Sequence, residues 1–138
     1  MKLTFTHRHA YPTTSVGVSL PVRLWVGKRY SDLVAMVDTG SSHCLFERFH
    51  ADDLQLDLES GQPMVVGTAT GRLRAFGHMV EIDVLGHVVS SMVYFFADYE
   101  VNKNLLGRTG WLDRVRFGLV EYESEVYFAP YDFDAPLH

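Results

Sequence analysis

The sequence predicts an all-β protein, a sandwich or a barrel of short strands, within its 138 residues. Apolar residues recur at every second position in several segments, which is the period of a half-buried strand. Turns containing glycine or proline separate these segments at short, regular intervals, and few segments have a helical pattern. Hydrophobic residues make up 47% and charged residues 21% of the chain, an ordinary globular composition that excludes a disordered protein.

The first strands are predicted by alternation. Every second residue in Val16–Val26 is apolar. Pro21 lies within this run, and a proline there indicates a sheet edge or a bulge. A turn at 27–29 then predicts a hairpin with the strand 31–37. Within that strand, Leu33–Val37 is almost continuously apolar, which predicts burial on both faces.

The rest of the chain continues the β pattern with little helix. A short helix is predicted at Glu47–Leu54, with Phe49 and Leu54 facing inward, and one or two helical turns at Thr109–Arg114. Glycines between later strands, Gly77 among them, are expected at turns. These later strands are predicted at 44–46, 64–69, 73–76, 79–85, 88–96, 115–120 and 126–128. We expect one domain over residues 1–138, with its core at about 15–130.

Charge and cysteine usage exclude several functions. Lys and Arg number 12 against 17 Asp and Glu, a net charge of −5, so we expect no nucleic acid partner. Apolar runs fall well short of the ~20 residues of a membrane span, and the N-terminal residues lack the apolar core of a signal peptide. Cys44 is the only cysteine, which excludes an internal disulfide. A cytoplasmic protein without a membrane partner is therefore expected.

Two motifs carry residues suited to chemistry. Asp38-Thr39-Gly40 ends the apolar strand, which would place a carboxylate at a strand mouth, beside a hydroxyl and a glycine that permits close approach. Because all three residues also favour turns, a plain turn is the alternative. Farther along the chain, Leu105-Leu106-Gly107-Arg108 precedes the predicted helical turns. By itself this segment could equally be a strand that ends in a turn.

Together the two motifs resemble those of the retropepsin-like aspartic proteases, the single-domain relatives of pepsin. Gly107 follows Asp38 by 69 residues, close to the family's spacing, and Ser41-Ser42 is similar to the pepsin-type version of the loop. The resemblance extends over about Val16 to Val120. It implies a single-domain closed barrel, with one short helix after the Leu-Leu-Gly strand, and the activity of a bacterial-type aspartic endopeptidase.

The resemblance also implies residue roles. The catalytic loop would be Asp38, Thr39 and Gly40. Residues that support the loop would be Ser41, Leu105, Leu106, Gly107 and Arg108. A mobile hairpin, the flap, would cover the substrate with Gly67, Thr68, Ala69, Thr70 and Gly71. The family hydrolyses peptides with two aspartates and no cofactor or metal. Since this sequence has one Asp-Thr-Gly, a working site would be a homodimer with Asp38 from each chain, acting on a peptide or protein.

The sequence departs from the retroviral pattern at two places. An aspartate that pairs with the arginine after the glycine is replaced by Ser42, so Arg108 needs another partner, for which Glu47 and Asp113 are candidates. A predicted hairpin, Val115–Phe128, extends beyond the retroviral end of the chain. Two other functions therefore stay open: a non-catalytic peptide-binding or regulatory module on the same fold, and a purely structural β domain.

Other candidate sites are weaker. His7 and His9 form a His-x-His pair without further ligands at a fixed spacing, so no metal site is predicted. His43 and Cys44 are adjacent on a strand and would point to opposite faces, which excludes a nucleophile–base pair. Cys44 is therefore expected to be a small buried residue, and Trp111 to belong to the core.

Overall fold

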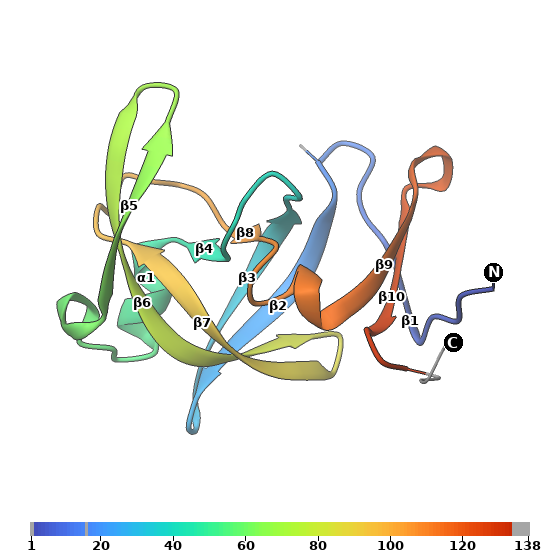
Figure 1. Cartoon of the computed structure of the whole chain (residues 1–138), viewed down its shortest axis with the longest axis horizontal. Coiled ribbons are helices and arrows are strands. Elements are labelled where there is room, and N and C mark those ends of the chain that lie inside the picture. Colours follow the sequence, from blue (N-terminus) through green and yellow to red (C-terminus); the bar gives the residue numbers. More distant parts are fainter. Residues whose placement is uncertain (1, 16, 134–138) are drawn as a thin grey trace.

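The computed structural model describes residues 2–15 and 17–133 and is built mainly of β-strands in two sheets (Figure 1). The strands are β1 (His7–Ala10), β2 (Ser19–Val26), β3 (Arg29–Val37), β4 (Leu45–Phe46), β5 (Gln62–Thr68), β6 (Gly71–Val84), β7 (His87–Phe96), β8 (Leu105–Leu106), β9 (Val115–Val120) and β10 (Glu125–Pro130). The predicted all-β class is confirmed.

A seven-stranded sheet forms the main body, in the order β2-β3-β8-β4-β7-β6-β5. β2 also pairs with β6, where Arg23–Trp25 lies antiparallel to Glu81–Asp83, so the sheet curls back on itself. Pro21 precedes that pairing and lies where β2 is bonded only to β3. The proline, which has no N–H to donate, therefore occupies an edge position, as the sequence predicts.

A three-stranded sheet, in the order β1-β10-β9, lies beside the main sheet and joins the two ends of the chain (Figure 1). β9 and β10 form the predicted hairpin around a 3₁₀ turn, η3 (Glu121–Glu123). β1 is absent from the sequence prediction because His7-Arg8-His9 has no apolar alternation. Pairing with β10 holds this strand, and the ring of His7 stacks on Phe128 at 4.6 Å between centroids.

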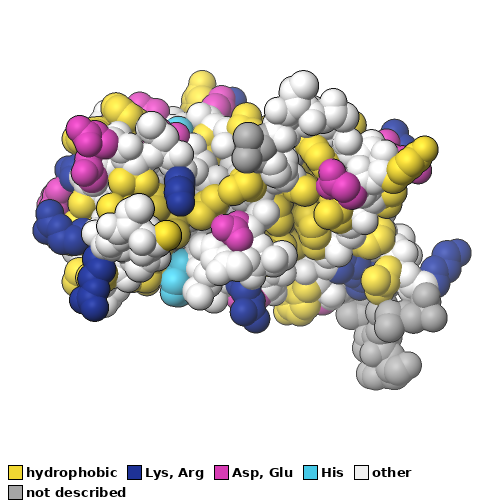
Figure 2. All heavy atoms as spheres, turned by 90° about the horizontal axis from the view of Figure 1, so that it is seen from above, with side chains coloured by type: hydrophobic (Ala, Val, Ile, Leu, Met, Phe, Trp, Pro, Cys, Tyr) yellow, Lys and Arg dark blue, Asp and Glu magenta, His cyan; other side chains and the backbone are white. Residues whose placement is uncertain are grey.

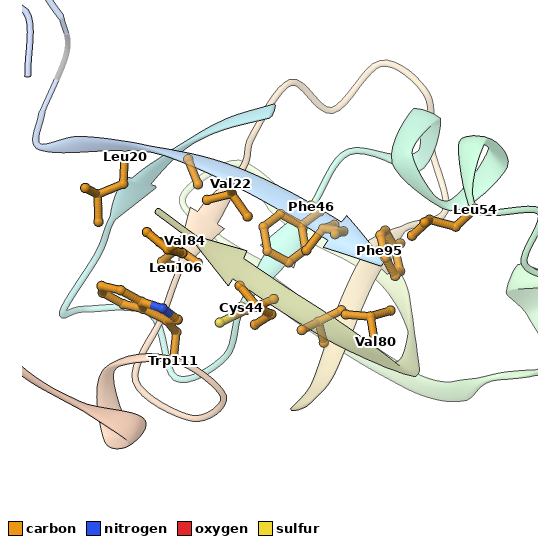
Figure 3. Close-up of a cluster of buried hydrophobic side chains, with 14 of the residues drawn as sticks. Leu20, Val22, Cys44, Phe46, Leu54, Val80, Val84, Phe95, Leu106 and Trp111 are labelled. Carbon is orange, nitrogen blue, oxygen red and sulfur yellow. The ribbon is translucent and has the colours of Figure 1, made fainter. Parts of the chain in front are cut away.

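The core lies inside the curled sheet and continues to the small one (Figure 3). Trp111, which follows β8, is fully buried and contacts Phe128 and Phe117 edge to face, with centroids 5.5 and 6.2 Å away. This indole therefore connects the two sheets, and its predicted place in the core is confirmed. Burial of an aromatic ring such as Phe128 stabilises the fold by about 1.5–3 kcal/mol.

Helical structure is limited to α1 (Arg48–Asp53) and short 3₁₀ turns, η1 (Leu58–Ser60) and η2 (Leu112–Arg114) among them. The segment Thr109–Arg114 forms only the single turn η2. Gly110 has a φ of +113°, which ends any helix there, and its N–H donates to the Asp113 carboxylate at 3.0 Å. Within the described ranges, no helix is long and apolar enough to cross a membrane.

Gly77 lies in the middle of β6, so the prediction of a turn there was wrong. It pairs with Gln62 on one side and Tyr94 on the other. A β-carbon on Gly77 would lie 2.8 Å from the ring of Tyr94. The glycine therefore lets a side chain of β7 lie across β6, which is a packing role that resembles a turn signal in sequence.

Two burial predictions were also wrong. Val34 is 64% exposed while its neighbour Ala35 is buried, so β3 is a half-buried strand rather than one covered on both faces. Phe49 is 51% exposed and packs against the ring of Tyr99, whereas Leu54 is buried as predicted. Phe49 and Leu54 are five residues apart, which separates them by about 140° around a helix, so they cannot both face inward.

Candidate active site

Strands β3, β4 and β8 bring distant segments to one edge of the sheet. β3 and β8 run parallel, with Met36 opposite Leu105 and Val37 opposite Leu106. β4 lies antiparallel to β8. Parallel strands end at the same edge, so the residues that follow β3 and β8 meet there. The N–H of Asp38 donates to the carbonyl of Leu106 at 2.9 Å, which joins the two predicted motifs.

The Asp38 carboxylate is held by its own loop. Its Oδ1 accepts a hydrogen bond from the N–H of Gly40 at 2.9 Å, and the N–H of Ser41 donates to the carbonyl of Asp38 at 3.2 Å. A backbone N–H that donates to a carboxylate fixes the orientation of that carboxylate. Within the described residues, Oδ2 of Asp38 accepts no hydrogen bond, so it can face a ligand.

The segment 107–109, which follows β8, crosses directly beneath this loop. The N–H of Arg108 donates to the carbonyl of Ser41, and that of Thr109 to the carbonyl of Ser42, both at 2.9 Å. Gly107 lies between these segments, where a β-carbon would be 2.9 Å from the carbonyl oxygen of Ser41. Only glycine allows this close approach, which explains the Leu-Leu-Gly pattern.

A groove of about 560 Å³ opens beside Asp38. Its lining residues are Asp38, Gly40, Ser41, Ser42, His43, Leu45, Met64, Val65, Val66, Gly67, Thr68, Ala69, Leu73, Phe96, Lys103 and Leu105. The predicted loop and the predicted flap residues Gly67, Thr68 and Ala69 thus border one space. The lining does not include four other predicted site residues: Thr70, Gly71 and the exposed Thr39 and Arg108. Two more, Leu106 and Gly107, are buried.

The hairpin of β5 and β6 projects from the body of the molecule (Figure 1). Thr68 pairs with Gly71, so Ala69 and Thr70 form a two-residue turn. The hydroxyl of Thr68 donates to the carbonyl of Gly71 at 3.0 Å. No atom lies within 4 Å of a β-carbon built on Gly67, so the hairpin meets open space on that side.

The hairpin points upwards in Figure 1, and Figure 2 shows the molecule from that side. Hydrophobic atoms lie along the middle of this face. The groove's own lining is apolar at Leu45, Phe96 and Leu105, which form a small buried cluster. Sequence reasoning did not assign Lys103 or His43 to the groove. Lys103 follows no motif, and His43 is recognisable only by its place directly after the Asp38 loop.

Comparison with known proteins agrees with this geometry. A family model described as aspartyl protease matches residues 21–109, which contain both the Asp38 loop and the segment that crosses beneath it. The chain belongs to the aspartyl protease family. A search of curated proteins gives no match to this chain.

Solved structures of aspartyl proteases share the fold. One is a retropepsin-like aspartic protease from Rickettsia conorii, with a TM-score of 0.60 and 19% identity over 79% of this chain and 88% of that one. Another is the EIAV protease complexed with the inhibitor HBY-793, with a TM-score of 0.53 and 17% identity over 71% of this chain and 88% of that one. The predicted retropepsin-like fold is therefore confirmed.

The lone cysteine of this aspartyl protease is inert. Cys44 is fully buried, as predicted, and its sulfur accepts a hydrogen bond from the N–H of Gly107 at 3.4 Å. Burial raises the pKa of the Cys44 thiol to about 11, so the thiol stays protonated near neutral pH. Cys44 therefore packs beneath the site.

Arg108 does not pair with either candidate carboxylate, so that prediction was wrong. The Glu47 carboxylate accepts a hydrogen bond from Nδ2 of Asn104 at 2.6 Å, and Asp113 binds the N–H of Gly110. The side chain of Arg108 is exposed instead. In this aspartyl protease, the loop is tied to the crossing segment by backbone hydrogen bonds.

Proposed function

We propose that this chain is an aspartic endopeptidase, active as a homodimer, that hydrolyses peptide bonds with water activated by Asp38 from both copies. One observation carries the proposal: the oriented carboxylate of Asp38 borders the same groove as the projecting hairpin at Gly67. The sequence holds one Asp-Thr-Gly, so the second carboxylate would come from a second copy.

The chemistry follows from two carboxylates close together. Like charges at short distance cannot both ionise, so the pair holds one proton. The ionised Asp38 would accept a proton from water as it attacks the scissile carbonyl, and the protonated Asp38 would donate to the carbonyl oxygen. The N–H of Gly40 would keep Oδ1 oriented, which leaves the other oxygen for water or substrate.

The remaining predicted residues would bind substrate or support the loop. An extended peptide would lie in the groove as an added strand beneath the hairpin 67–71, whose backbone N–H groups would bind it. Thr39 would reach towards its counterpart in the second copy; within the described residues its hydroxyl makes no hydrogen bond. Ser41 and Leu105–Arg108 would hold the loop through the backbone contacts described above.

We place the second copy at a second concavity that Asp38 borders. Its volume is about 480 Å³, and it is lined by Val34, Met36 and Asn104 as well as by Asp38. Val34 is 64% exposed although it lies within a strand. An exposed apolar side chain beside a carboxylate that needs a second carboxylate favours self-association at this concavity.

The direct test is Asp38→Asn, with Asp57→Asn as the matched control. Asp57 lies outside the groove and its side chain caps no helix. Turnover of a diverse peptide library at acidic and neutral pH should fall by at least about 10²–10⁴-fold in Asp38→Asn and stay unchanged in Asp57→Asn. Wild-type activity should also fall faster than linearly on dilution, as dimers dissociate. A wild-type protein that binds peptides and cleaves none would instead be the peptide-binding module.

A further inference from the structure

The lining of the groove contains more basic than acidic side chains. Besides Asp38, the described residues that line it include two ionisable side chains, Lys103 and His43, and both are basic. Apart from the proposed catalytic carboxylate, the groove offers a substrate the positive charge of the Lys103 ammonium group. The His43 ring is packed edge to face against Tyr94 at 5.0 Å, so Lys103 is the freer of the two.

Lys103 is placed beside Asp38 by an anchored loop. Its neighbour Asn104 accepts the Met36 N–H at its backbone carbonyl, 2.9 Å away. The Asn104 side chain exchanges two hydrogen bonds with Glu47, at 2.6 and 3.0 Å. These bonds fix the backbone from which the Lys103 side chain extends.

Lys103 and Asp38 border the same two concave regions. Both residues line the groove beneath the hairpin and also the concavity in which we place the second copy, so Lys103 lies where the groove meets the proposed dimer interface. Lys103 is exposed, and within the described residues no carboxylate lies within 4.0 Å of its ammonium group. Within the described residues it is therefore a cation without a counterion from its own chain, in the same groove as the proposed reacting group.

We propose that Lys103 is a specificity-determining residue that selects peptides carrying a carboxylate close to the scissile bond. The inference rests on the proposed function and names the substrate class of the same groove. An ammonium–carboxylate hydrogen bond would supply the preference, while an apolar side chain of the peptide would contact Leu45, Phe96 and Leu105. The carboxylate can come from an Asp or Glu side chain or from the C-terminus of a short peptide.

The test uses matched peptides with an apolar core, bearing Glu, Gln or Lys near the scissile bond and ending in a free or an amidated C-terminus. We expect wild-type kcat/KM to favour Glu over Gln by about fivefold, the range of a partly exposed ion pair. Lys103→Met should abolish the preference, and Lys103→Glu should reverse it towards peptides with Lys. Lys28→Met, in the turn between β2 and β3, is the control and should keep the wild-type preference. A preference that follows the free C-terminus rather than Glu would assign the carboxylate to the chain end.

Binding separates this inference from the protease proposal. Fluorescence anisotropy of labelled Glu and Gln peptides is measured with Asp38→Asn, in the presence and absence of Lys103→Met. A Glu preference in binding that Lys103→Met removes supports the role of Lys103, even if wild-type protein cleaves nothing. Cleavage with equal rates for Glu and Gln, or a preference that persists in Lys103→Met, overturns the role of Lys103 and leaves the protease proposal intact. Absence of both cleavage and binding overturns both.

Discussion

Gly107 lies directly against the carbonyl group of His43: a β-carbon at position 107 would be 2.1 Å from that oxygen. This contact lets the segment 107–109 lie beneath the Asp38 loop, where the N–H of Arg108 donates to the carbonyl of Ser41. The orientation of Asp38 thus depends on a residue without a side chain, placed 69 positions later in the chain.

Gly107→Ala should therefore disturb the loop. The added methyl group has to displace backbone, which costs about 1–3 kcal/mol of stability in a packed interior. We expect a lower urea unfolding midpoint and reduced peptide cleavage. Gly67→Ala is the control for the unfolding midpoint alone, because no atom lies within 4 Å of its β-carbon. Equal midpoints for Gly107→Ala and wild type would show that the crossing does not constrain the loop.

Gly67→Val tests whether the hairpin of β5 and β6 covers the substrate. Valine is branched at its β-carbon and would block the approach of a peptide backbone to the groove. Folding should change by no more than ~0.5 kcal/mol, since the position faces open space. Peptide turnover should drop sharply, measured as kcat/KM on the best library substrate. If binding and cleavage both stay at wild-type levels, the hairpin does not act as a flap.

His87 should make stability depend on pH. Its ring lies 6.2 Å from those of His7 and Phe128, and its buried Nε2 has no hydrogen-bond partner in the described structure. Burial, followed by the charge of His7, lowers the pKa of His87, while Asp83 acts in the opposite direction. The folded state thus binds this proton less tightly than the unfolded state. The stability contributed by neutral His87 is present above the ordinary histidine pKa of about 6.5 and is lost as the pH falls below it.

The corresponding measurement is urea unfolding of wild type and His87→Phe at about pH 7.5 and about pH 5.5. Wild type should lose more stability on acidification than His87→Phe, which keeps an aromatic ring and removes the titration. The half-buried His50, whose pKa burial also lowers, is present in both proteins and cancels in the comparison. An identical loss in both proteins would show that His87 does not titrate between the two states.

The fold was predictable where alternation is strong and local. β2 and β7 bury alternate residues over much of their length, so their sequences reveal them. β1 was not predictable, because it is held by pairing with β10 and by the stacking of His7 on Phe128. The turn predicted at Gly77 was wrong because a glycine that makes room for a neighbouring aromatic ring looks the same in sequence as a glycine in a turn.

The site was predictable where a motif has a backbone cause. Gly107 is required by a close approach of backbone, and a β-carbon on Gly40 would crowd the Asp38 carboxylate at 3.2 Å, so the motifs that contain these glycines are recognisable in sequence. Lys103 was not predictable, since its place beside Asp38 depends on Asn104 bonding to both Met36 and Glu47. Such bonds join three separate segments and leave no local pattern.

The central claim is that each active site contains Asp38 from two copies, and mixing experiments test it most directly. Wild type and Asp38→Asn are co-refolded at a constant total concentration, and peptide cleavage is measured as the fraction of wild type varies. If both carboxylates are needed and the chains pair at random, an equal mixture should retain about one quarter of the wild-type activity. An equal mixture that retains one half, in proportion to the wild-type chain present, would contradict the account.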